Sequence, residues 1–158
     1  MSNYLSPVEV AKHAYNAGFR GAALIKAVAI AWGESNLNAH AIGDTNLVTE
    51  KWGASLGLWQ IRSLNNNPAS YPYPDNYRDA SQLSLPAFNA KAAYAISKKG
   101  TDFSHWTVYN NGSYTQYIDR VTEAIKEVGE FVSNNKSSVV GGLIAIATAF
   151  YFLTKKKS

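Results

Sequence analysis

The sequence contains no cysteine among its 158 residues. This excludes both a disulfide framework and a thiolate metal site, so the fold has to be stabilised by packing. Its three histidines, His13, His40 and His105, lack the spacing of metal ligands, and we expect no metal and no other cofactor. Residues 1–20 also lack the basic start and the apolar stretch of a signal peptide, so none is expected.

Charge is also scarce, since 16% of the residues are charged and the net charge is +4. Lys155, Lys156 and Lys157 supply three of the positive charges, which leaves 12 basic residues against 11 acidic ones. A nearly neutral body without a basic stripe gives no support to nucleic-acid binding. The hydrophobic fraction of 46% indicates a globular domain.

Local signals in residues 1–132 predict a mainly helical α+β domain. Ser6 as the N-cap, Pro7 at the first helical position and Glu9 three residues after the cap predict a helix that Gly18 ends. Residues 36–62 lose helical periodicity and collect glycines, which indicates a small lobe containing a loop and a hairpin or short sheet. Further helices are expected at about residues 21–33, 85–99 and 113–132, with a short helix or turn within residues 102–110.

Glu34 follows a stretch of unusual composition. Residues 22–32 are apolar on nearly every face, which predicts a central helix packed on all sides. Burial raises the pKa of a carboxyl group because it disfavours the charged form, and it can keep a glutamic acid protonated near neutral pH. Glu34 is therefore a candidate proton donor. The alternative is that Glu34 is the first solvated residue after a helix that ends at Gly33.

Several motifs follow the Glu34-Ser35 pair in a set order. A Gly-Leu-Trp-Gln-Ile segment begins at Gly57, 23 residues after Glu34. The later motifs are Asn89–Ile96, Tyr109–Gly112 and Tyr117–Val121. With these motifs, residues 8–125 resemble the lysozyme-like family, which includes lytic transglycosylases, goose-type lysozymes and their phage relatives. That family has a helical domain with a small loop or hairpin lobe.

The resemblance implies a peptidoglycan-degrading enzyme. It would cleave the β-1,4 bond between N-acetylmuramic acid and N-acetylglucosamine, with Glu34 as the general acid and base. Ser35, Gln60, Tyr109 and Asn110 correspond to substrate-binding residues of the family, and Tyr109 to a tyrosine beside the catalytic carboxyl. For Ser35 the alternative is a helix-terminal serine that donates to a carbonyl, and for Gln60 it is a polar group paired within a strand.

The branch of the family stays open. In lytic transglycosylases the resemblance implies that Glu34 also acts as the base while a hydroxyl of the muramic acid attacks. Goose-type hydrolases use a distant carboxylate to orient water, for which Asp44 and Glu50 are the candidates. Asp44 follows a glycine, so a turn-forming aspartate that bonds its own backbone is the alternative. The chain departs from the family pattern at Trp59, where methionine is frequent, and at Val108, where alanine is usual.

The end of the chain has a different composition. Residues 133–138 form a polar linker, residues 139–154 carry no charge, and residues 155–158 form a basic tail. The uncharged residues between Lys136 and Lys155 would span roughly 27 Å as a helix, close to the thickness of about 30 Å of a bilayer's hydrocarbon core. We therefore expect a transmembrane anchor helix, and the alternative is a buried helix of the domain. The small residues that recur every fourth position suggest helix–helix self-association: Gly141, Ala145 and Ala149.

These features predict a membrane-anchored protein with one C-terminal span. The lysine triplet favours the cytoplasmic side, which conflicts with an extracytoplasmic wall substrate. A location in a virion membrane or in the host cell envelope would remove that conflict. The alternative functions are a non-catalytic wall-binding protein and a membrane-perturbing protein on the same fold.

Overall fold

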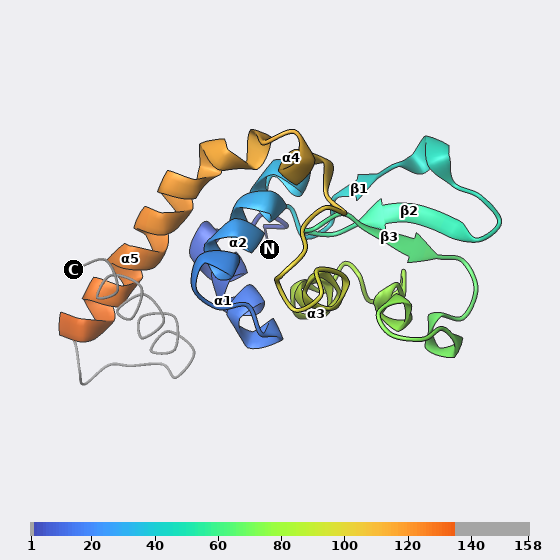
Figure 1. The fold of residues 1–158 in the computed structure, drawn as a ribbon, viewed down its shortest axis with the longest axis horizontal. Helices are drawn as coiled ribbons and strands as arrows, with labels where there is room; N and C mark the ends of the chain where they lie inside the picture. Colours follow the sequence, from blue (N-terminus) through green and yellow to red (C-terminus); the bar gives the residue numbers. More distant parts are fainter. Residues whose placement is uncertain (1, 135–158) are drawn as a thin grey trace.

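The computed structural model describes the backbone of residues 2–134 and the side chains of residues 2–126. Helices make up one side of the molecule and a small sheet the other, as Figure 1 shows. The α-helices are α1 (Pro7–Ala17), α2 (Gly21–Ser35), α3 (Pro86–Ile96), α4 (Thr107–Asn110) and α5 (Ile118–Asn134). The strands are β1 (Ile42–Gly43), β2 (Trp52–Leu56) and β3 (Ile61–Leu64). Four short 3-10 turns join them: η1 (Thr45–Leu47), η2 (Pro68–Ser70), η3 (Asp75–Tyr77) and η4 (Ser113–Tyr117).

The start of α1 confirms the predicted cap. The Ser6 hydroxyl accepts the Glu9 N–H at 3.2 Å, and the Glu9 carboxylate accepts the Ser6 N–H at 2.7 Å. Pro7 occupies the first turn, where its missing N–H costs nothing. Gly18 ends the helix at φ +127°, a conformation that side chains rarely adopt.

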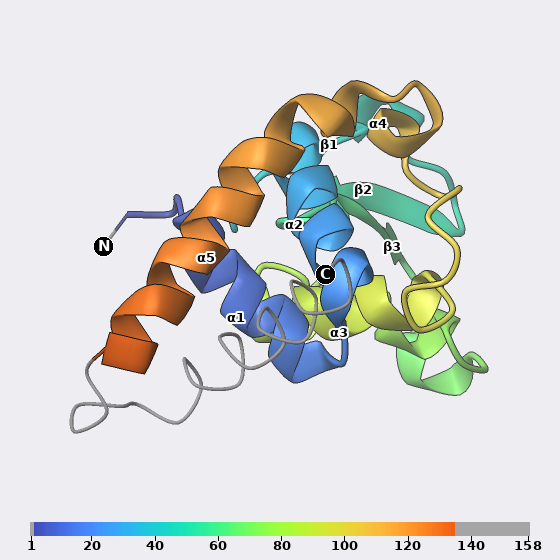
Figure 2. The same cartoon turned by 60° about the vertical axis from the view of Figure 1, so that its left-hand side comes forward.

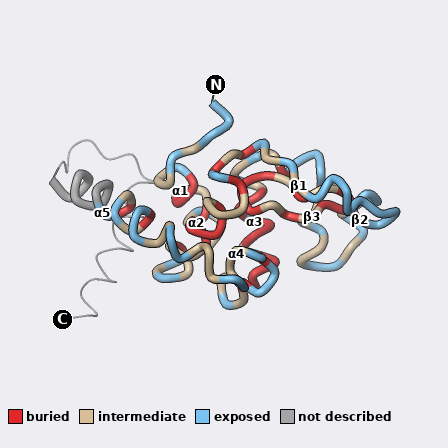
Figure 3. The backbone as a smooth tube through the Cα atoms, turned by 90° about the horizontal axis from the view of Figure 1, so that it is seen from above, coloured by how far each residue is buried: buried red, intermediate tan, exposed pale blue. Residues whose placement is uncertain are grey.

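Helix α2 is the centre of the helical part, as predicted. Residues 27–31 are completely buried, and the helix packs against α1, α4, α5 and η4. Figure 2 shows α2 enclosed by these elements, and Figure 3 shows buried residues on α2 as well as on α3 and the strands. The helix continues two residues beyond Gly33 and ends where Asn36 turns left-handed at φ 53°. Glu34 therefore lies in the last helical turn.

The small lobe is a three-stranded antiparallel sheet in the order β1-β2-β3. The Gly-Leu-Trp-Gln-Ile motif does not form a strand, because residues 57–60 make the turn between β2 and β3. Gly57 and Gln60 both have positive φ, at 78° and 46°. A residue in that conformation breaks the ladder of a strand, so Gln60 is a turn residue and not a paired strand residue.

Helix α3 packs behind this turn. It ends at Ile96, three residues before the predicted end at Lys99. Lys98 and Lys99 are left-handed at φ 49° and 63°, and the Lys98 ammonium pairs with Asp102 at 2.8 Å. The lysines thus build the turn that follows the helix instead of its last turn.

The region predicted as one helix at 113–132 is two elements, η4 and then α5, which runs to Asn134 and so two residues into the predicted linker. The remaining linker, the predicted anchor helix at 139–154 and the basic tail lie outside the described residues. Between residues 2 and 134, none of the helices has the length and apolar character needed to cross a bilayer.

Candidate active site

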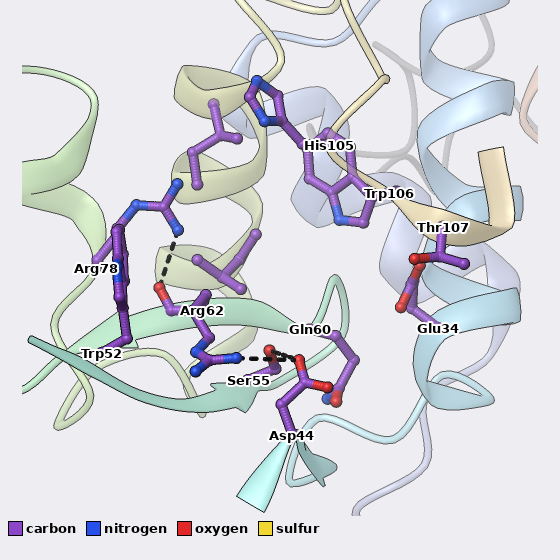
Figure 4. A pocket seen from close by; sticks show the side chains of 12 residues that line it. Glu34, Asp44, Trp52, Ser55, Gln60, Arg62, Arg78, His105, Trp106 and Thr107 are labelled. Atoms are coloured by element: carbon purple, nitrogen blue, oxygen red, sulfur yellow. Dashed lines mark hydrogen bonds and ion pairs between the residues drawn. The ribbon is translucent and has the colours of Figure 1, made fainter. Parts of the chain in front are cut away.

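A cleft of about 550 Å³ separates the sheet from the end of α2 (Figure 4). Helix α2, the sheet, the β2–β3 turn and the segment before α4 all contribute side chains to it. The described lining residues are Glu34, Asp44, Trp52, Ser55, Gln60, Ile61, Arg62, Arg78, Ile96, His105, Trp106 and Thr107. The cleft is thus mostly polar, open to solvent on one side, and contains two carboxyl groups.

Glu34 lies on the helical wall of the cleft, beside Thr107 in Figure 4. It is half-buried, so the alternative of a solvated residue after the helix is wrong. The backbone N–H of Val108 points at its Oε1 at 3.5 Å, the long limit of a hydrogen bond. Gly33 lets this segment approach, since a Cβ there would lie 3.2 Å from Val108 Cγ1.

Burial raises the pKa of Glu34 above its ordinary value, because desolvation penalises the carboxylate. The N–H of Val108 opposes this effect, and the nearby negative charge of Asp44 adds to it. The net direction is upward. A glutamic acid in this state retains its proton at higher pH than an exposed one and can donate it to a leaving oxygen.

Asp44 lies on the opposite, sheet side of the cleft (Figure 4). Its carboxylate accepts the Ser55 hydroxyl at 2.5 Å and lies 3.8 Å from Nη1 of Arg62. The sheet register explains this cluster, since Gly43 pairs with Ser55 and Ser55 pairs with Arg62. Asp44 is the N-cap residue of η1 and forms that turn at φ 54°, as the alternative proposed, but its side chain makes no capping bond there and is directed to Ser55 and Arg62 instead.

Gln60 also lines the cleft. Its side-chain Nε2 donates to the carbonyls of Ala41 at 3.1 Å and Gly57 at 3.0 Å, which ties the turn to the start of the sheet. Its Oε1 lies against Gly43, where a Cβ would overlap it. The glutamine therefore has a fixed orientation on the cleft wall.

Two of the predicted substrate-binding residues do not belong to the described lining. Ser35 is buried, and its hydroxyl donates to the Ala31 carbonyl at 2.9 Å, as the alternative for this residue proposed. The ring of Tyr109 packs between Phe103 and Tyr114, with centroids 5.9 and 5.3 Å away. In the described contacts, the backbone N–H of Val108 approaches the Glu34 carboxyl, whereas the Tyr109 hydroxyl does not.

Two further candidates also lie outside the described lining. Asn110 is exposed, and its Nδ2 donates to the Ser104 carbonyl at 2.8 Å. Glu50 is exposed on the loop between β1 and β2. Of the two carboxylates considered for orienting water, the structure brings Asp44 to the cleft and leaves Glu50 outside it.

The sequence reasoning missed most of the remaining lining residues, among them Trp52, Ser55, Arg62, Arg78 and Trp106. Ser55 and Arg62 reach the cleft because of strand register, which residue spacing alone does not reveal. For Trp106 the sequence contained only an indirect signal, namely Trp59, the large residue in the turn motif with which it interacts. The Trp106 indole donates to the Trp59 carbonyl at 2.7 Å.

Trp59 itself is a core residue. It is completely buried, and its indole N–H donates to the carbonyl of Ala27 in the middle of α2 at 2.8 Å. The backbone N–H of Trp59 donates to Asn89 at 2.9 Å. The tryptophan found where the family often has methionine therefore joins the turn to α2 and α3.

A helical domain whose central helix places a half-buried glutamic acid opposite a small sheet is the arrangement of lysozyme-type glycan-cleaving proteins. The family model described as "Lysozyme like domain" matches residues 11–108, which include every described lining residue of the cleft. The chain belongs to this lysozyme-like family. Searches of curated proteins and of solved structures gave no match. Family membership supports a peptidoglycan-cleaving enzyme.

Proposed function

We propose that the chain cleaves the β-1,4 bond between N-acetylmuramic acid and N-acetylglucosamine, with Glu34 as the general acid. The observation that carries the proposal is the half-buried carboxyl of Glu34 on the cleft wall, with its pKa raised by burial. Protonation of the leaving oxygen by Glu34 separates the two sugars and leaves oxocarbenium character on the muramic acid. The carboxylate of Glu34 then acts as a base in the second step.

Asp44 is the second residue of the proposal. Held by the Ser55 hydroxyl and near Arg62, its carboxylate places a negative charge across the cleft from Glu34. A fixed charge there stabilises the positive charge that develops on the sugar ring. It also keeps the Glu34 pKa raised. Asp44 serves this role whether the second step uses water or a hydroxyl of the muramic acid.

The proposal is tested with purified peptidoglycan and the Glu34→Gln variant. Glutamine keeps the shape of the side chain and removes its proton, so muropeptide release should fall at least about a thousandfold, a loss in the range for removing an acid that also acts as the base. Glu50→Gln is the matched control, because Glu50 is exposed outside the described lining and should leave release unchanged. Undiminished release by a folded Glu34→Gln protein would contradict the proposal.

Mass spectrometry of the same products assigns the branch. A 1,6-anhydro end on the muramic acid identifies a lytic transglycosylase, because an internal hydroxyl has then replaced water. A reducing end identifies a hydrolase. Binding of the wall without any new ends would identify a non-catalytic wall-binding protein.

On sequence grounds alone, we also propose that residues 139–154 anchor the protein in a virion or host envelope membrane. The full chain should then float with liposomes, and a chain that ends at Asn134 should not. Equal flotation of the two proteins would contradict the anchor.

A further inference from the structure

Two arginines line the sheet side of the cleft, and the proposed chemistry does not use their remaining donors. Arg78 enters from the loop after η3, and Arg62 from β3. In Figure 4 their guanidinium groups lie across the cleft from Glu34 and Thr107, with Arg78 beside Trp52. We call Arg62 and Arg78 the arginine wall.

Arg78 is fixed in place with donors to spare. Its Nε donates to Asp75 at 2.7 Å, its Nη1 donates to the Arg62 carbonyl at 2.9 Å, and its guanidinium lies 5.3 Å from the centroid of the Trp52 ring. A guanidinium carries five N–H groups, so three of them remain after these two bonds. Arg78 lines the cleft with a side chain that is 14% exposed, and Figure 4 shows its guanidinium beside Trp52 on the sheet side.

Arg62 is also incompletely paired. Its Nη2 donates to the carbonyl of Leu47, and its Nη1 lies 3.8 Å from Asp44, which is beyond hydrogen-bond distance. Within the described part of the chain, its buried Nε has no hydrogen-bond partner. A ligand cannot reach the buried Nε, but Nη1 forms no described hydrogen bond and can donate to a new acceptor at this wall.

The arginine wall places two guanidinium groups on this side of the cleft. Asp75 forms a close ion pair with Arg78 at 2.7 Å, so the contribution of Arg78 to anion binding lies in its remaining N–H donors. The contact of Asp44 with Arg62 is long and partly solvated, so it neutralises Arg62 only weakly.

The ligand chemistry follows from peptidoglycan itself. N-acetylglucosamine has no acidic group, whereas muramic acid carries a lactyl substituent on its 3-oxygen. That substituent ends in a carboxylate, or continues through an amide into a peptide stem with carboxylates of its own. A planar guanidinium fork fits a carboxylate with two parallel hydrogen bonds.

We propose that the arginine wall binds a carboxylate of the muramic acid substituent and so selects peptidoglycan over neutral chitin-like glycans. The inference rests on the proposed function, because it assigns the substrate of the same cleft. It adds a specificity-determining role for Arg78, which lines the cleft with donors to spare.

The test measures binding in the Glu34→Gln background, so that no ligand is consumed. Calorimetric titration uses three glycan ligands of equal length: chitin oligosaccharide, denuded muramic acid glycan with free lactyl carboxylates, and glycan with intact stems. Because binding is measured without cleavage, a failed inference is distinguishable from a failed catalytic proposal.

Arg78→Gln should weaken binding of at least one of the acidic glycans about tenfold, the equivalent of one charge-assisted contact. Binding of chitin oligosaccharide should not change. Loss for the denuded glycan identifies the lactyl carboxylate, and loss for the stem-bearing glycan identifies the stem carboxylates. Equal weakening for all three ligands, or none for either acidic glycan, would overturn the inference.

Arg20→Gln is the matched control. Arg20 donates to the carbonyls of Tyr15 and Phe19 and stacks on the Tyr15 ring, 3.7 Å from its centroid, so its loss removes similar contacts at the far end of α2. It should leave binding of all three glycans unchanged. Arg78→Lys keeps the charge if Arg78→Gln does not fold, and it should retain part of the preference for acidic glycans.

Discussion

Asn89 connects three parts of the molecule that surround the cleft, and its loss should be costly. The residue is completely buried on α3. Its Nδ2 donates to the carbonyls of Leu56 at 2.9 Å and Leu83 at 2.8 Å, and its Oδ1 accepts the Trp59 N–H at 2.9 Å. Asn89→Ala would remove the hydrogen-bond partner of one donor, the Trp59 N–H, and of two acceptors, the carbonyls of Leu56 and Leu83.

The expected cost follows from these three bonds. Leaving a buried polar group unsatisfied costs about 1–3 kcal/mol, and removing the side chain also opens a small cavity. Because neighbouring effects are not fully additive, we expect Asn89→Ala to lower the free energy of unfolding by about 3–5 kcal/mol. That is a large part of the total of about 5–15 kcal/mol for a typical domain.

Urea denaturation followed by circular dichroism measures this difference. Asn110→Ala is the control, because Asn110 is exposed and its side chain makes one described hydrogen bond, to the Ser104 carbonyl. Its loss should cost less than about 1 kcal/mol. A loss below about 1 kcal/mol for Asn89→Ala as well would refute the argument that this side chain holds the β2–β3 turn.

Three further changes test other contacts. Gly57→Ala should lower the melting temperature more than Gly112→Ala; both glycines have φ near +78°, but a Cβ on Gly57 overlaps the Leu83 carbonyl and one on Gly112 meets nothing within 4 Å. Equal losses would show that the overlap is harmless. Burial raises the Glu34 pKa, so the free energy of unfolding of the native protein should fall as pH rises through the folded-state pKa. Glutamine does not titrate, so the stability of Glu34→Gln relative to the native protein should increase over the same pH range. A stability difference that is constant across pH would contradict this sign. Asp44→Asn should reduce muropeptide release about tenfold or more and move the alkaline limb of the pH–rate profile to lower pH, because the Asp44 charge raises the Glu34 pKa. An unmoved limb would exclude that coupling.

Local signals predicted the helical part well, for physical reasons that act over a few residues. The cap at Ser6 and Glu9 uses bonds within one helical turn, and the apolar run before Glu34 predicted the burial of α2. The end of α3 was predicted three residues late, because Lys98 and Lys99 adopt left-handed conformations that their chemistry does not signal.

The sequence predicted a site residue only where that residue's own position along the chain determines its surroundings. Glu34 could be found because its position at the end of an apolar helix determines its environment. Arg62 and Arg78 depend on strand register and on a long loop, so their place in the cleft is a property of the tertiary structure. The family pattern gave a role to Tyr109, yet the backbone of its neighbour Val108 is what reaches Glu34.

The central claim is that burial raises the pKa of the Glu34 carboxyl and so fits it to donate a proton to the glycosidic oxygen. Carbon-13 NMR titration of the Glu34 side-chain carboxyl measures this directly in the native protein. We predict a pKa above the ordinary glutamate value that coincides with the alkaline limb of the pH–rate profile for muropeptide release. A pKa at or below the ordinary value, or a limb that does not follow it, would contradict the account.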